Sequence, residues 1–351
     1  MVGTPNSTTA RGYVVHSDEA PAFWQLGNLW RVMATGVQTG NSFCLLDQLV
    51  MANGGGPCTH SHTQDEGLYV VSGHCTFYAW GLTIPAGPGE FVAVPRYGQH
   101  AFKVDAPDTQ LINFYLPAGF EILLMGLAHP AERNELPPPG VPMPPRKLVE
   151  RLSSDYGQIP ILGLPFADPP RDDNMATKPT PGATVPAFNT NVSTAPAYWF
   201  AGSLWTVLAD GAATDGSYCL FEQLISKGPA APPHMHRDMD EVFYMLDGEA
   251  EFLVGDRRET ARKGALVFIP RGTVHGFCVV SDGARFLNLY TPAGFDRLVT
   301  TMGQKTETRT LPPPGWTSPD FPHGRRDELF TEVGMLRLGV ADPFRADATG
   351  T

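Results

Sequence analysis

Residues 54–73 read GGGPCTHSHTQDEGLYVVSG, and this stretch decides how the rest of the chain is interpreted. It holds His60, His62 and Glu66, and His100 follows after an interval that contains glycine and proline. Side chains alternate across a β-strand, so the two histidines of the HSH triplet point to one face. Three imidazoles and one carboxylate that meet inside a protein form a ligand set for a transition metal. The sequence therefore predicts a metal site built on short strands.

The chain repeats itself with an offset of about 175 residues, which predicts a duplicated domain. The second copy of the ligand pattern consists of His234, His236, Glu241 and His275. Further matches pair Trp24 with Trp199, Cys44 with Cys219, Gln48 with Gln223, Asn113 with Asn288, Tyr115 with Tyr290, and residues 117–120 with residues 292–295. We predict two domains, residues 1–177 and 178–351, joined by a Pro-rich polar linker at residues 171–187.

The composition favours short strands and many turns over long helices, because the 351 residues include 37 glycines and 34 prolines. Within each half, six to eight apolar runs are separated by Gly, Pro and Asp turns. This spacing predicts an antiparallel sandwich or barrel. Short outer helices are expected at residues 120–127 and 148–154 in the first half, and at residues 295–302 and 328–335 in the second.

The overall charge and the chain start limit the classes of partner. The net charge of −11 argues against nucleic acid, because no basic stripe is present to neutralise phosphates. No run of about 18 apolar residues occurs, so no membrane partner is expected. The start, MVGTPNSTTARGYVV, lacks a basic stretch followed by an apolar run, and we therefore expect no signal peptide and a cytoplasmic location.

The histidine clusters stand apart from the remaining histidines. A lone histidine in a strand is more often a core or surface residue than a ligand, and we assign four of them to the surface: His16, His74, His129 and His323. The two triplets differ, because burying three unpaired imidazoles and a carboxylate without a cation would cost considerable free energy. Their occurrence at equivalent positions of a repeat favours metal binding.

The acidic residues near the clusters have more than one interpretation. Glu66 and Glu241 can each serve as a metal ligand or as a proton acceptor beside the metal. The neighbouring Asp65, Asp238 and Asp240 are interpreted as solvated turn charges. Two roles for the glutamates therefore stay open at this point.

Three nitrogens and one oxygen suit Mn, Fe, Co, Ni, Cu or Zn, whereas Mg and Ca prefer mostly oxygen ligands. We expect one divalent transition metal per domain, with Fe, Cu, Mn, Ni and Co as the candidates and the identity left open. Four protein ligands on a metal that accepts five or six leave room for a substrate oxygen or for O2. Such an open position is typical of a catalytic site.

Both halves resemble the two sequence motifs of the cupin superfamily. The first motif is matched by Gly54-x5-His60-x-His62-x3-Glu66-x6-Gly73 and by Gly228-x5-His234-x-His236-x4-Glu241-x6-Gly248. The second is matched by Gly264-x5-Pro270-x-Gly272-x2-His275. In the first half Gly89, Pro95 and His100 are in place, but Tyr97 occupies the glycine position and Gly98 follows, so we expect a different turn before His100. The resemblance implies an all-β bicupin, with two double-stranded β-helix (jelly-roll) barrels and short flanking helices.

Among bicupins, the chain is most similar to the quercetin dioxygenases. The similarity lies in the complete three-histidine, one-glutamate set of each half and in the PAGFE and PAGFD segments that lead into a helix. In that family a flavonol binds the metal through its 3-hydroxyl, the glutamate accepts the proton, O2 adds to the ring, and carbon monoxide leaves. The resemblance implies that Glu66 and Glu241 are base and ligand, and that the six clustered histidines are ligands. It also implies an apolar slot for a small planar aromatic substrate, lined by Leu68, Val70, Phe243 and Met245.

Other functions are compatible with the same sequence. A tailoring oxygenase could act on another polyphenol or polyketide. An oxalate decarboxylase or oxidase would need a cationic side chain beside the metal and usually a Trp next to the histidines, whereas Ser61 and Met235 stand there. A non-enzymatic ligand-binding cupin is disfavoured because such proteins commonly lose ligands, and both sets are complete. A homodimer is compatible with all of these functions.

Overall fold

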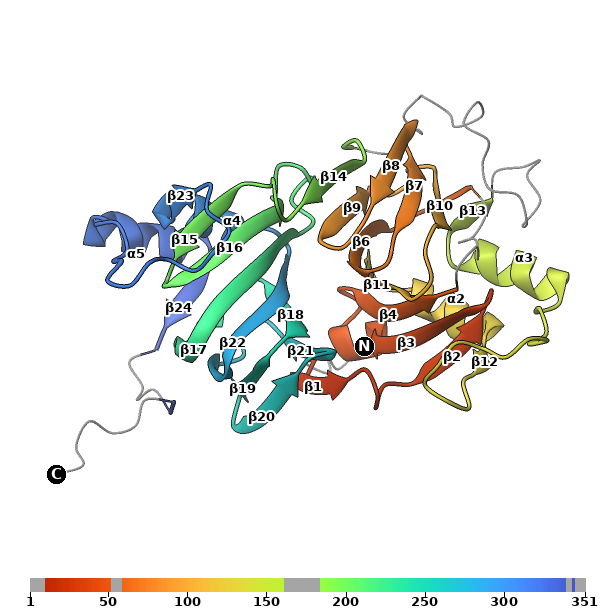
Figure 1. Ribbon diagram of the computed structural model, residues 1–351, viewed down its shortest axis with the longest axis horizontal. Coiled ribbons are helices and arrows are strands. Elements are labelled where there is room, and N and C mark those ends of the chain that lie inside the picture. The colour runs from red at the N-terminus through yellow and green to blue at the C-terminus, as the bar shows by residue number, and fades with distance from the viewer. Residues whose placement is uncertain (1–9, 52–58, 161–183, 339–342, 345–351) are drawn as a thin grey trace, which may run out of the picture.

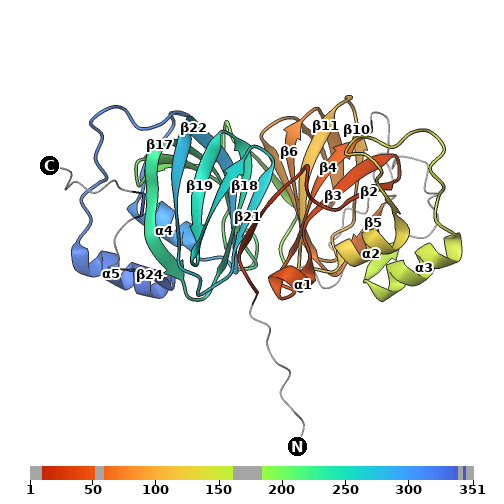
Figure 2. The same ribbon diagram turned by 90° about the horizontal axis from the view of Figure 1, so that it is seen from below.

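The computed structural model describes residues 10–51, 59–160, 184–338 and 343–344. Two β-barrels lie side by side, and the helices within these residues are short (Figures 1 and 2). The predicted all-β bicupin architecture is confirmed. The predicted boundary between residues 177 and 178 lies outside the described residues, as do Gly54, Cys58 and most of the predicted linker.

The N-terminal half builds one barrel from two antiparallel sheets. Its strands are β1 (Tyr13–His16), β2 (Ala22–Gln25), β3 (Asn28–Ala34), β4 (Cys44–Val50), β5 (His60–His62), β6 (Asp65–Ser72), β7 (Cys75–Ala79), β8 (Leu82–Ala86), β9 (Glu90–Val94), β10 (His100–Val104), β11 (Thr109–Leu116), β12 (His129–Pro130) and β13 (Gln158–Pro160). Its helices are α1 (Gly36–Thr39), α2 (Phe120–Leu127) and α3 (Arg146–Asp155). One sheet has the order β12-β2-β3-β4-β11-β6-β9-β14, and the other has the order β13-β5-β10-β7-β8.

The C-terminal half repeats this barrel. Its strands are β14 (Phe188–Asn191), β15 (Ala197–Phe200), β16 (Ser203–Ala209), β17 (Cys219–His236), β18 (Asp240–Asp247), β19 (Glu249–Val254), β20 (Arg257–Arg262), β21 (Ala265–Ile269), β22 (His275–Thr291), β23 (Gln304–Thr306) and β24 (Met335–Arg337). Its helices are α4 (Phe295–Met302) and α5 (His323–Glu332). The long strands β17 and β22 correspond to β4 plus β5 and to β10 plus β11, so they join both layers into one sheet with β1 at its edge.

The first strand of each half pairs with the barrel of the other half. Strand β1 pairs with β21 of the C-terminal barrel, with Tyr13 opposite Phe268. Strand β14 pairs with β9 of the N-terminal barrel, with Phe188 opposite Ala93. Figure 1 shows β1 next to β21 of the neighbouring barrel. Each barrel is therefore completed by a strand from the other half.

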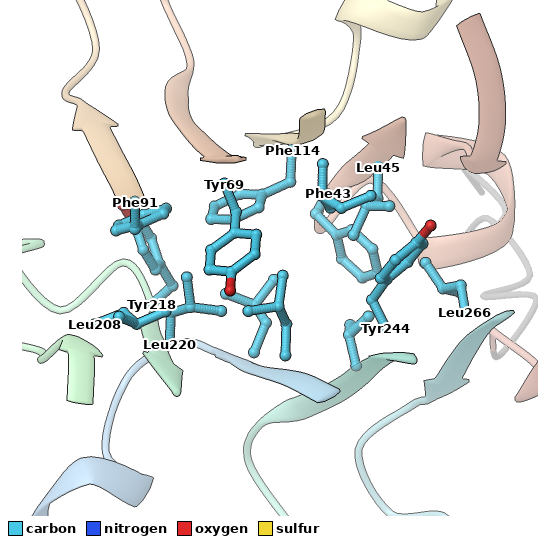
Figure 3. Close-up of a cluster of buried hydrophobic side chains, with 14 of the residues drawn as sticks. Phe43, Leu45, Tyr69, Phe91, Phe114, Leu208, Tyr218, Leu220, Tyr244 and Leu266 are labelled. Carbon is cyan, nitrogen blue, oxygen red and sulfur yellow. The ribbon is translucent and has the colours of Figure 1, made fainter. Parts of the chain in front are cut away.

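A buried hydrophobic cluster joins the two barrels face to face (Figure 3). Phe43 and Phe114 of the first half meet Phe268 and Tyr218 of the second, with ring centroids 5.4 and 5.3 Å apart. Two tyrosines place their hydroxyls across this boundary. Tyr244 donates to Asp47 over 2.7 Å, and its counterpart Tyr69 donates to Glu222. The interface thus has the same pseudo-twofold symmetry as the sequence repeat.

The predicted helices match the structure at three of four places. Helices α2 and α4 span the predicted residues 120–127 and 295–302, and α3 contains residues 148–154. The prediction of a helix at 328–335 is wrong at its end. Helix α5 ends at Glu332, Gly334 takes the left-handed conformation with a φ of 67°, and Met335 begins a strand opposite His236. Among the described helices, none combines the length and apolar character that a bilayer crossing requires.

Candidate metal centres

The imidazoles of the first half meet where β5 pairs with β10, and those of the second half meet at the equivalent pairing of β17 with β22. His60 and His62 lie on β5, and His100 is the first residue of β10, directly opposite His60. The ring centroids of His60 and His100 are 4.3 Å apart. In the second half, His234 and His275 are paired in the same way, with centroids 4.1 Å apart. Because the strand alternates, the second histidine of each HxH triplet lies on the same face as the first.

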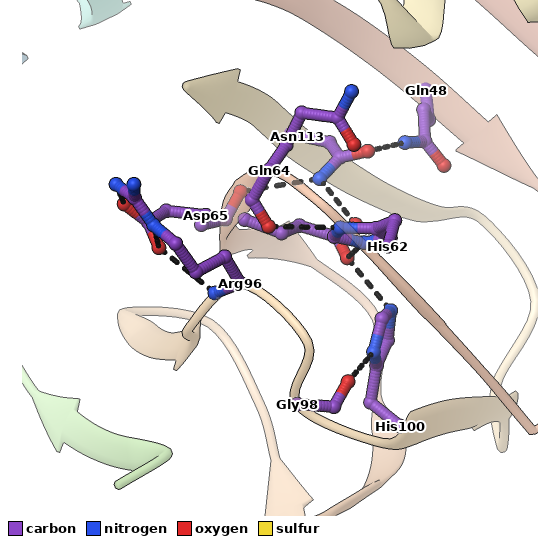
Figure 4. Close-up of polar contacts among 10 residues, drawn as sticks. Gln48, His62, Gln64, Asp65, Arg96, Gly98, His100 and Asn113 are labelled. Carbon is purple, nitrogen blue, oxygen red and sulfur yellow. Dashed lines mark hydrogen bonds and ion pairs between the residues drawn. The ribbon is translucent and has the colours of Figure 1, made fainter. Parts of the chain in front are cut away.

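The glutamates complete each cluster from the adjacent strand. Glu66 on β6 places Oε2 3.1 Å from His62 Nε2 and 2.8 Å from His100 Nε2 (Figure 4). Glu241 on β18 places Oε2 at nearly the same distances, 3.2 Å from His236 Nε2 and 2.8 Å from His275 Nε2. All eight side chains are buried. The structure therefore gathers the predicted ligand residues into two groups of four.

The arrangement fits a bound cation. In the C-terminal centre the four ligand atoms lie within 4.8 Å of one another, and in the N-terminal centre the three imidazoles do. In the C-terminal centre His236 Nε2, His275 Nε2 and Glu241 Oε2 are buried without a hydrogen-bond partner. Buried polar atoms without partners are costly, and a cation at their common point would satisfy all three. Each domain therefore holds one candidate site for a divalent metal.

Backbone carbonyls hold most of these rings in the tautomer that a metal needs. A carbonyl oxygen can only accept, so the ring nitrogen facing it must donate. Nδ1 of His62 donates to Gln64 O, and Nδ1 of His100 donates to Gly98 O, each over 2.9 Å. In the second half His234 and His275 donate to Pro232 and Thr273 in the same way, also over 2.9 Å. With Nδ1 donating, Nε2 is the nitrogen left to face the ion.

A buried amide pair orients each glutamate. Asn113 Nδ2 donates to Glu66 Oε1 over 2.8 Å, and Gln48 Nε2 donates to Asn113 Oδ1 over 2.8 Å. Asn288 and Gln223 make the same two bonds to Glu241 and to each other, over 3.1 and 2.6 Å. No role in the site was predicted for these residues from the sequence. Their recurrence at the 175-residue offset was the signal that could have identified them.

Stacked aromatic rings form a wall beside each centre. Tyr115 stacks on Phe120 at the start of α2 with centroids 4.3 Å apart, and it meets His62 at 5.5 Å. In the second half Tyr290 stacks on Phe295 at 4.3 Å, and both rings lie 5.4 Å from His236. The PAGF segments of the sequence therefore place an aromatic ring next to the metal ligands.

The electrostatics of the two glutamates favour the charged carboxylate. Burial alone would raise the pKa of Glu66, but its interactions with the nearby His100 and His62 imidazoles outweigh this effect and hold the pKa well below its usual value. Burial acts on Glu241 in the same direction, and the nearby His236 and His275 imidazoles likewise hold its pKa well below the usual value. Both carboxylates are therefore available as anionic ligands.

The expected difference in the turn before His100 is wrong. Tyr97 takes the left-handed conformation with a φ of 64°, and the corresponding Gly272 has a φ of 78°. Tyr97 N donates to His62 O over 2.6 Å, and Gly272 N donates to His236 O over 2.7 Å. The backbone geometry is thus conserved between the halves, although the first half places a side chain at a position that favours glycine.

Two acidic residues assigned to solvent are instead buried. Asp65 accepts hydrogen bonds from the backbone and guanidinium of Arg96, with Nη2 to Oδ2 at 2.6 Å (Figure 4). Asp240 accepts the same set from Arg271, with Nη2 to Oδ2 at 2.9 Å. Asp238 is exposed, as predicted, and pairs with Arg237.

The residues predicted to line a substrate slot belong to packed cores. Leu68 and Val70 are buried in a cluster of the N-terminal barrel. Phe243 and Met245 are buried in the matching C-terminal cluster, where Phe243 contacts three further phenylalanine rings: Phe252, Phe277 and Phe286. A cavity of about 340 Å³ lies elsewhere, between Trp24, Met51 and residues 137–144. The aromatic surface next to the ligands therefore comes from the Tyr–Phe stacks.

Comparison with known proteins gives matches in both halves of the chain. A family profile described as a cupin domain matches residues 48–111 and 221–290. The chain is 29% identical over 149 residues to a quercetin 2,3-dioxygenase from Bacillus subtilis, a match that covers 42% of this chain and 43% of that enzyme. It thus aligns with less than half of that relative's length. It is 32% identical over 95 residues to an uncharacterised protein from Streptomyces coelicolor, covering 24% of this chain and 88% of that protein.

Solved structures share the arrangement of two barrels. An oxalate decarboxylase from Bacillus subtilis, whose structure is described with Mn(II) centres, superposes with a TM-score of 0.57 at 12% identity, over 81% of this chain and 78% of that chain. The protein Ylba from E. coli superposes with a TM-score of 0.52 at 14% identity, over 83% of this chain and 94% of that chain. At these identities the likeness concerns the fold alone.

Proposed function

Because this chain belongs to the cupin superfamily and contains two cupin domains, we propose that it is a metal-dependent dioxygenase that cleaves a flavonol or a related aromatic enol or phenol with O2. The observation that carries the proposal is the pair of buried three-histidine, one-glutamate sets. The similarity to the quercetin 2,3-dioxygenase supports this substrate class. The aromatic wall beside each set supports a planar ligand.

The proposed chemistry divides between the metal and the chain. A metal held by His60, His62, His100 and Glu66, or by the equivalent set in the second half, supplies Lewis-acid and redox chemistry toward an enol oxygen and O2. Glu66 Oε1 is fixed by Asn113, so Oε2 is the oxygen that can take the hydroxyl proton of the substrate. The Tyr115–Phe120 stack offers an apolar surface against which a flat ring can be oriented.

The proposed reaction is balanced in atoms and protons. Both oxygen atoms of O2 enter the ring-opened product, and one ring carbon leaves as carbon monoxide with the oxygen it already carried. The proton that the glutamate accepts returns to the product. No further reductant or oxidant is required.

An oxalate-converting bicupin is the alternative from a different reaction class. A small dianion needs a free cationic side chain beside the metal. The arginines within the second motif, Arg96 and Arg271, are instead engaged by Asp65 and Asp240. This observation favours the aromatic substrate over the dianion.

The test is a single-turnover experiment with metal-reconstituted protein. Quercetin is bound without oxygen, O2 is then admitted, and the flavonol absorbance, carbon monoxide and product mass are recorded. We expect bleaching, one carbon monoxide per flavonol, and incorporation of both atoms of labelled O2. No bleaching with Fe, Mn, Ni, Cu or Co would exclude flavonols, and conversion of oxalate to formate and CO2 would favour the alternative.

A further inference from the structure

We propose that Ser42 and Ser217 are positioning residues, each of which acts on the metal centre of the opposite barrel. Ser217, in the C-terminal half, donates its hydroxyl to Asp65 Oδ2 over 2.8 Å. Ser42, in the N-terminal half, donates to Asp240 Oδ2 over 2.8 Å. Both contacts cross the interface between the barrels, and they are related by the 175-residue offset of the repeat.

The aspartates that receive these bonds stand directly before the glutamates of the metal centres. Asp65 and Glu66 are the first two residues of β6, and Asp240 and Glu241 are the first two residues of β18. Each aspartate is also held by an arginine side chain and by that arginine's backbone N–H. The serine hydroxyl therefore adds a further side-chain bond at the start of the strand from which the glutamate projects.

The contact between Ser217 and Asp65 shows why the serine hydroxyl matters. Asp65 is buried, with its side chain 10% exposed, so an unpaired oxygen there would carry a desolvation cost. Arg96 Nη2 and the Ser217 hydroxyl both reach Oδ2. Loss of the hydroxyl would leave the carboxylate held from one side only, which frees the start of β6 to shift.

Each serine loop is also tied to the centre of its own barrel. Asn41 O, next to Ser42, accepts a bond from Ala118 N over 3.3 Å. Ala118 lies two residues before Phe120, whose ring stacks on Tyr115. Gly216 O accepts from Ala293 N over 3.0 Å in the second half, where Phe295 follows. A continuous chain of contacts therefore runs from the aromatic wall of one centre to the glutamate of the other, in both directions.

The mechanical consequence is a crossed dependence. Removing the Ser217 hydroxyl should loosen Glu66, although Ser217 belongs to the C-terminal half. Removing the Ser42 hydroxyl should loosen Glu241. A residue that only stabilised the interface would affect both centres alike, so the crossed pattern separates positioning from general stability.

The inference rests on metal binding at both ligand sets, which is part of the proposed function, but it does not depend on oxygen chemistry. The test therefore uses Co(II) titration without substrate. One background, H234A/H236A, keeps only the N-terminal site, and the other, H60A/H62A, keeps only the C-terminal site. Ser217→Ala should weaken Co(II) binding about 3- to 10-fold in the first background and leave the second unchanged, because one hydrogen bond is lost. Ser42→Ala should show the opposite pattern.

Two controls separate positioning from interface loss. Ser217→Thr keeps a hydroxyl and should retain the affinity of the N-terminal site. Tyr244→Phe removes a bond across the same interface, from its hydroxyl to Asp47, and should leave both sites unchanged. Equal weakening of both sites by Ser217→Ala, or no weakening of either, would overturn the inference.

Hydrogen exchange in metal-free protein gives a second readout that survives failure of the proposed function. Ser217→Ala should raise amide exchange in β6, and Ser42→Ala should raise it in β18. If wild-type protein bound no Co(II), the proposed function would fail, and the exchange pattern would still decide the positioning role. Exchange that rises in the serine's own barrel, or in neither, would contradict that role.

Discussion

The two metal centres share every ligand type but hold the second imidazole differently. In the N-terminal centre three residues separate His62 from Glu66, and Gln64 O accepts the Nδ1 proton of His62. In the C-terminal centre four residues separate His236 from Glu241, and neither nitrogen of His236 has a hydrogen-bond partner. The loop between His236 and Glu241 is one residue longer, and no carbonyl oxygen faces Nδ1 of His236 as Gln64 O faces Nδ1 of His62. The first centre is thus oriented by the backbone, and the second depends more on the ion itself.

The glutamates show the same contrast. Glu66 Oε2 lies 3.1 Å from His62 Nε2, but the compact group of possible ligand atoms in this centre consists of the three imidazoles. Glu241 Oε2 has similar distances to its imidazoles but no aligned donor, and it lies with them in one compact group. We therefore expect Glu66 to serve mainly as a proton acceptor and Glu241 to serve mainly as a metal ligand.

The largest expected effect concerns the proton acceptor. Glu66→Gln should lower kcat for quercetin cleavage about 100-fold or more, which is the usual contribution of a general base. Glu241→Gln should lower it less, because the C-terminal glutamate is assigned mainly to metal binding. Steady-state kinetics at saturating metal will measure both. An equal loss in the two variants would remove the distinction between the centres.

Metal removal should destabilise the C-terminal barrel more than the N-terminal barrel. A metal ion present at a free concentration of 100 times its Kd adds about 2.7 kcal/mol to the free energy of unfolding. The partnerless His236, His275 and Glu241 atoms gain most from an ion. Hydrogen exchange with and without a chelator will locate the change. Greater loss of protection in β5 and β10 than in β17 and β22 would reverse the assignment.

The amide that orients each glutamate should act only within its own barrel. Asn113→Leu removes the donor to Glu66 Oε1 and should weaken metal binding at the N-terminal centre about 10-fold, as is usual for partners of metal ligands. Asn288→Leu is the matched change for the C-terminal centre. Metal titration in single-site backgrounds will separate the two. An effect of Asn113→Leu on the C-terminal centre would show that the barrels are coupled by a route other than the serine contacts.

The smallest expected effect concerns the turn before the third histidine. Tyr97→Gly should raise the free energy of unfolding by up to about 1 kcal/mol, because glycine adopts the left-handed conformation without steric cost. Gly272→Ala should lower it by about 1 kcal/mol for the same reason. Chemical denaturation will measure both. A destabilising Tyr97→Gly would mean that contacts of the tyrosine ring outweigh the backbone cost.

The ligand sets could be predicted because their signal is local. A histidine pair two apart in a strand must share a face, and the repeat doubles the evidence. Asp65 and Asp240 could not be assigned correctly in the same way, because their partners Ser217 and Ser42 are 152 and 198 residues away in the sequence. Whether a carboxylate is buried depends on the hydrogen-bond donors that distant parts of the chain place beside it.

The fold class followed from the strand spacing and the duplication, but the strand exchange did not. The side chains of β1 and β14 do not specify which barrel these strands join. An edge strand pairs through its backbone, which is the same for every sequence. The turn at Tyr97 was also misjudged, since a non-glycine residue can occupy a left-handed position when the surrounding hydrogen bonds fix it. The strands could therefore be predicted from local sequence patterns, whereas the neighbours of each strand depend on pairing between distant parts of the chain.

The exchanged strands β1 and β14 have a consequence for how the protein can be divided. Neither half contains all the strands of its own barrel, so a fragment that corresponds to one half would expose a bare sheet edge at β9 or β21. The two fragments, produced together as separate polypeptides, are expected to recombine into one particle. We therefore expect the two duplicated halves to unfold as a single cooperative unit, and neither half to fold as an autonomous module.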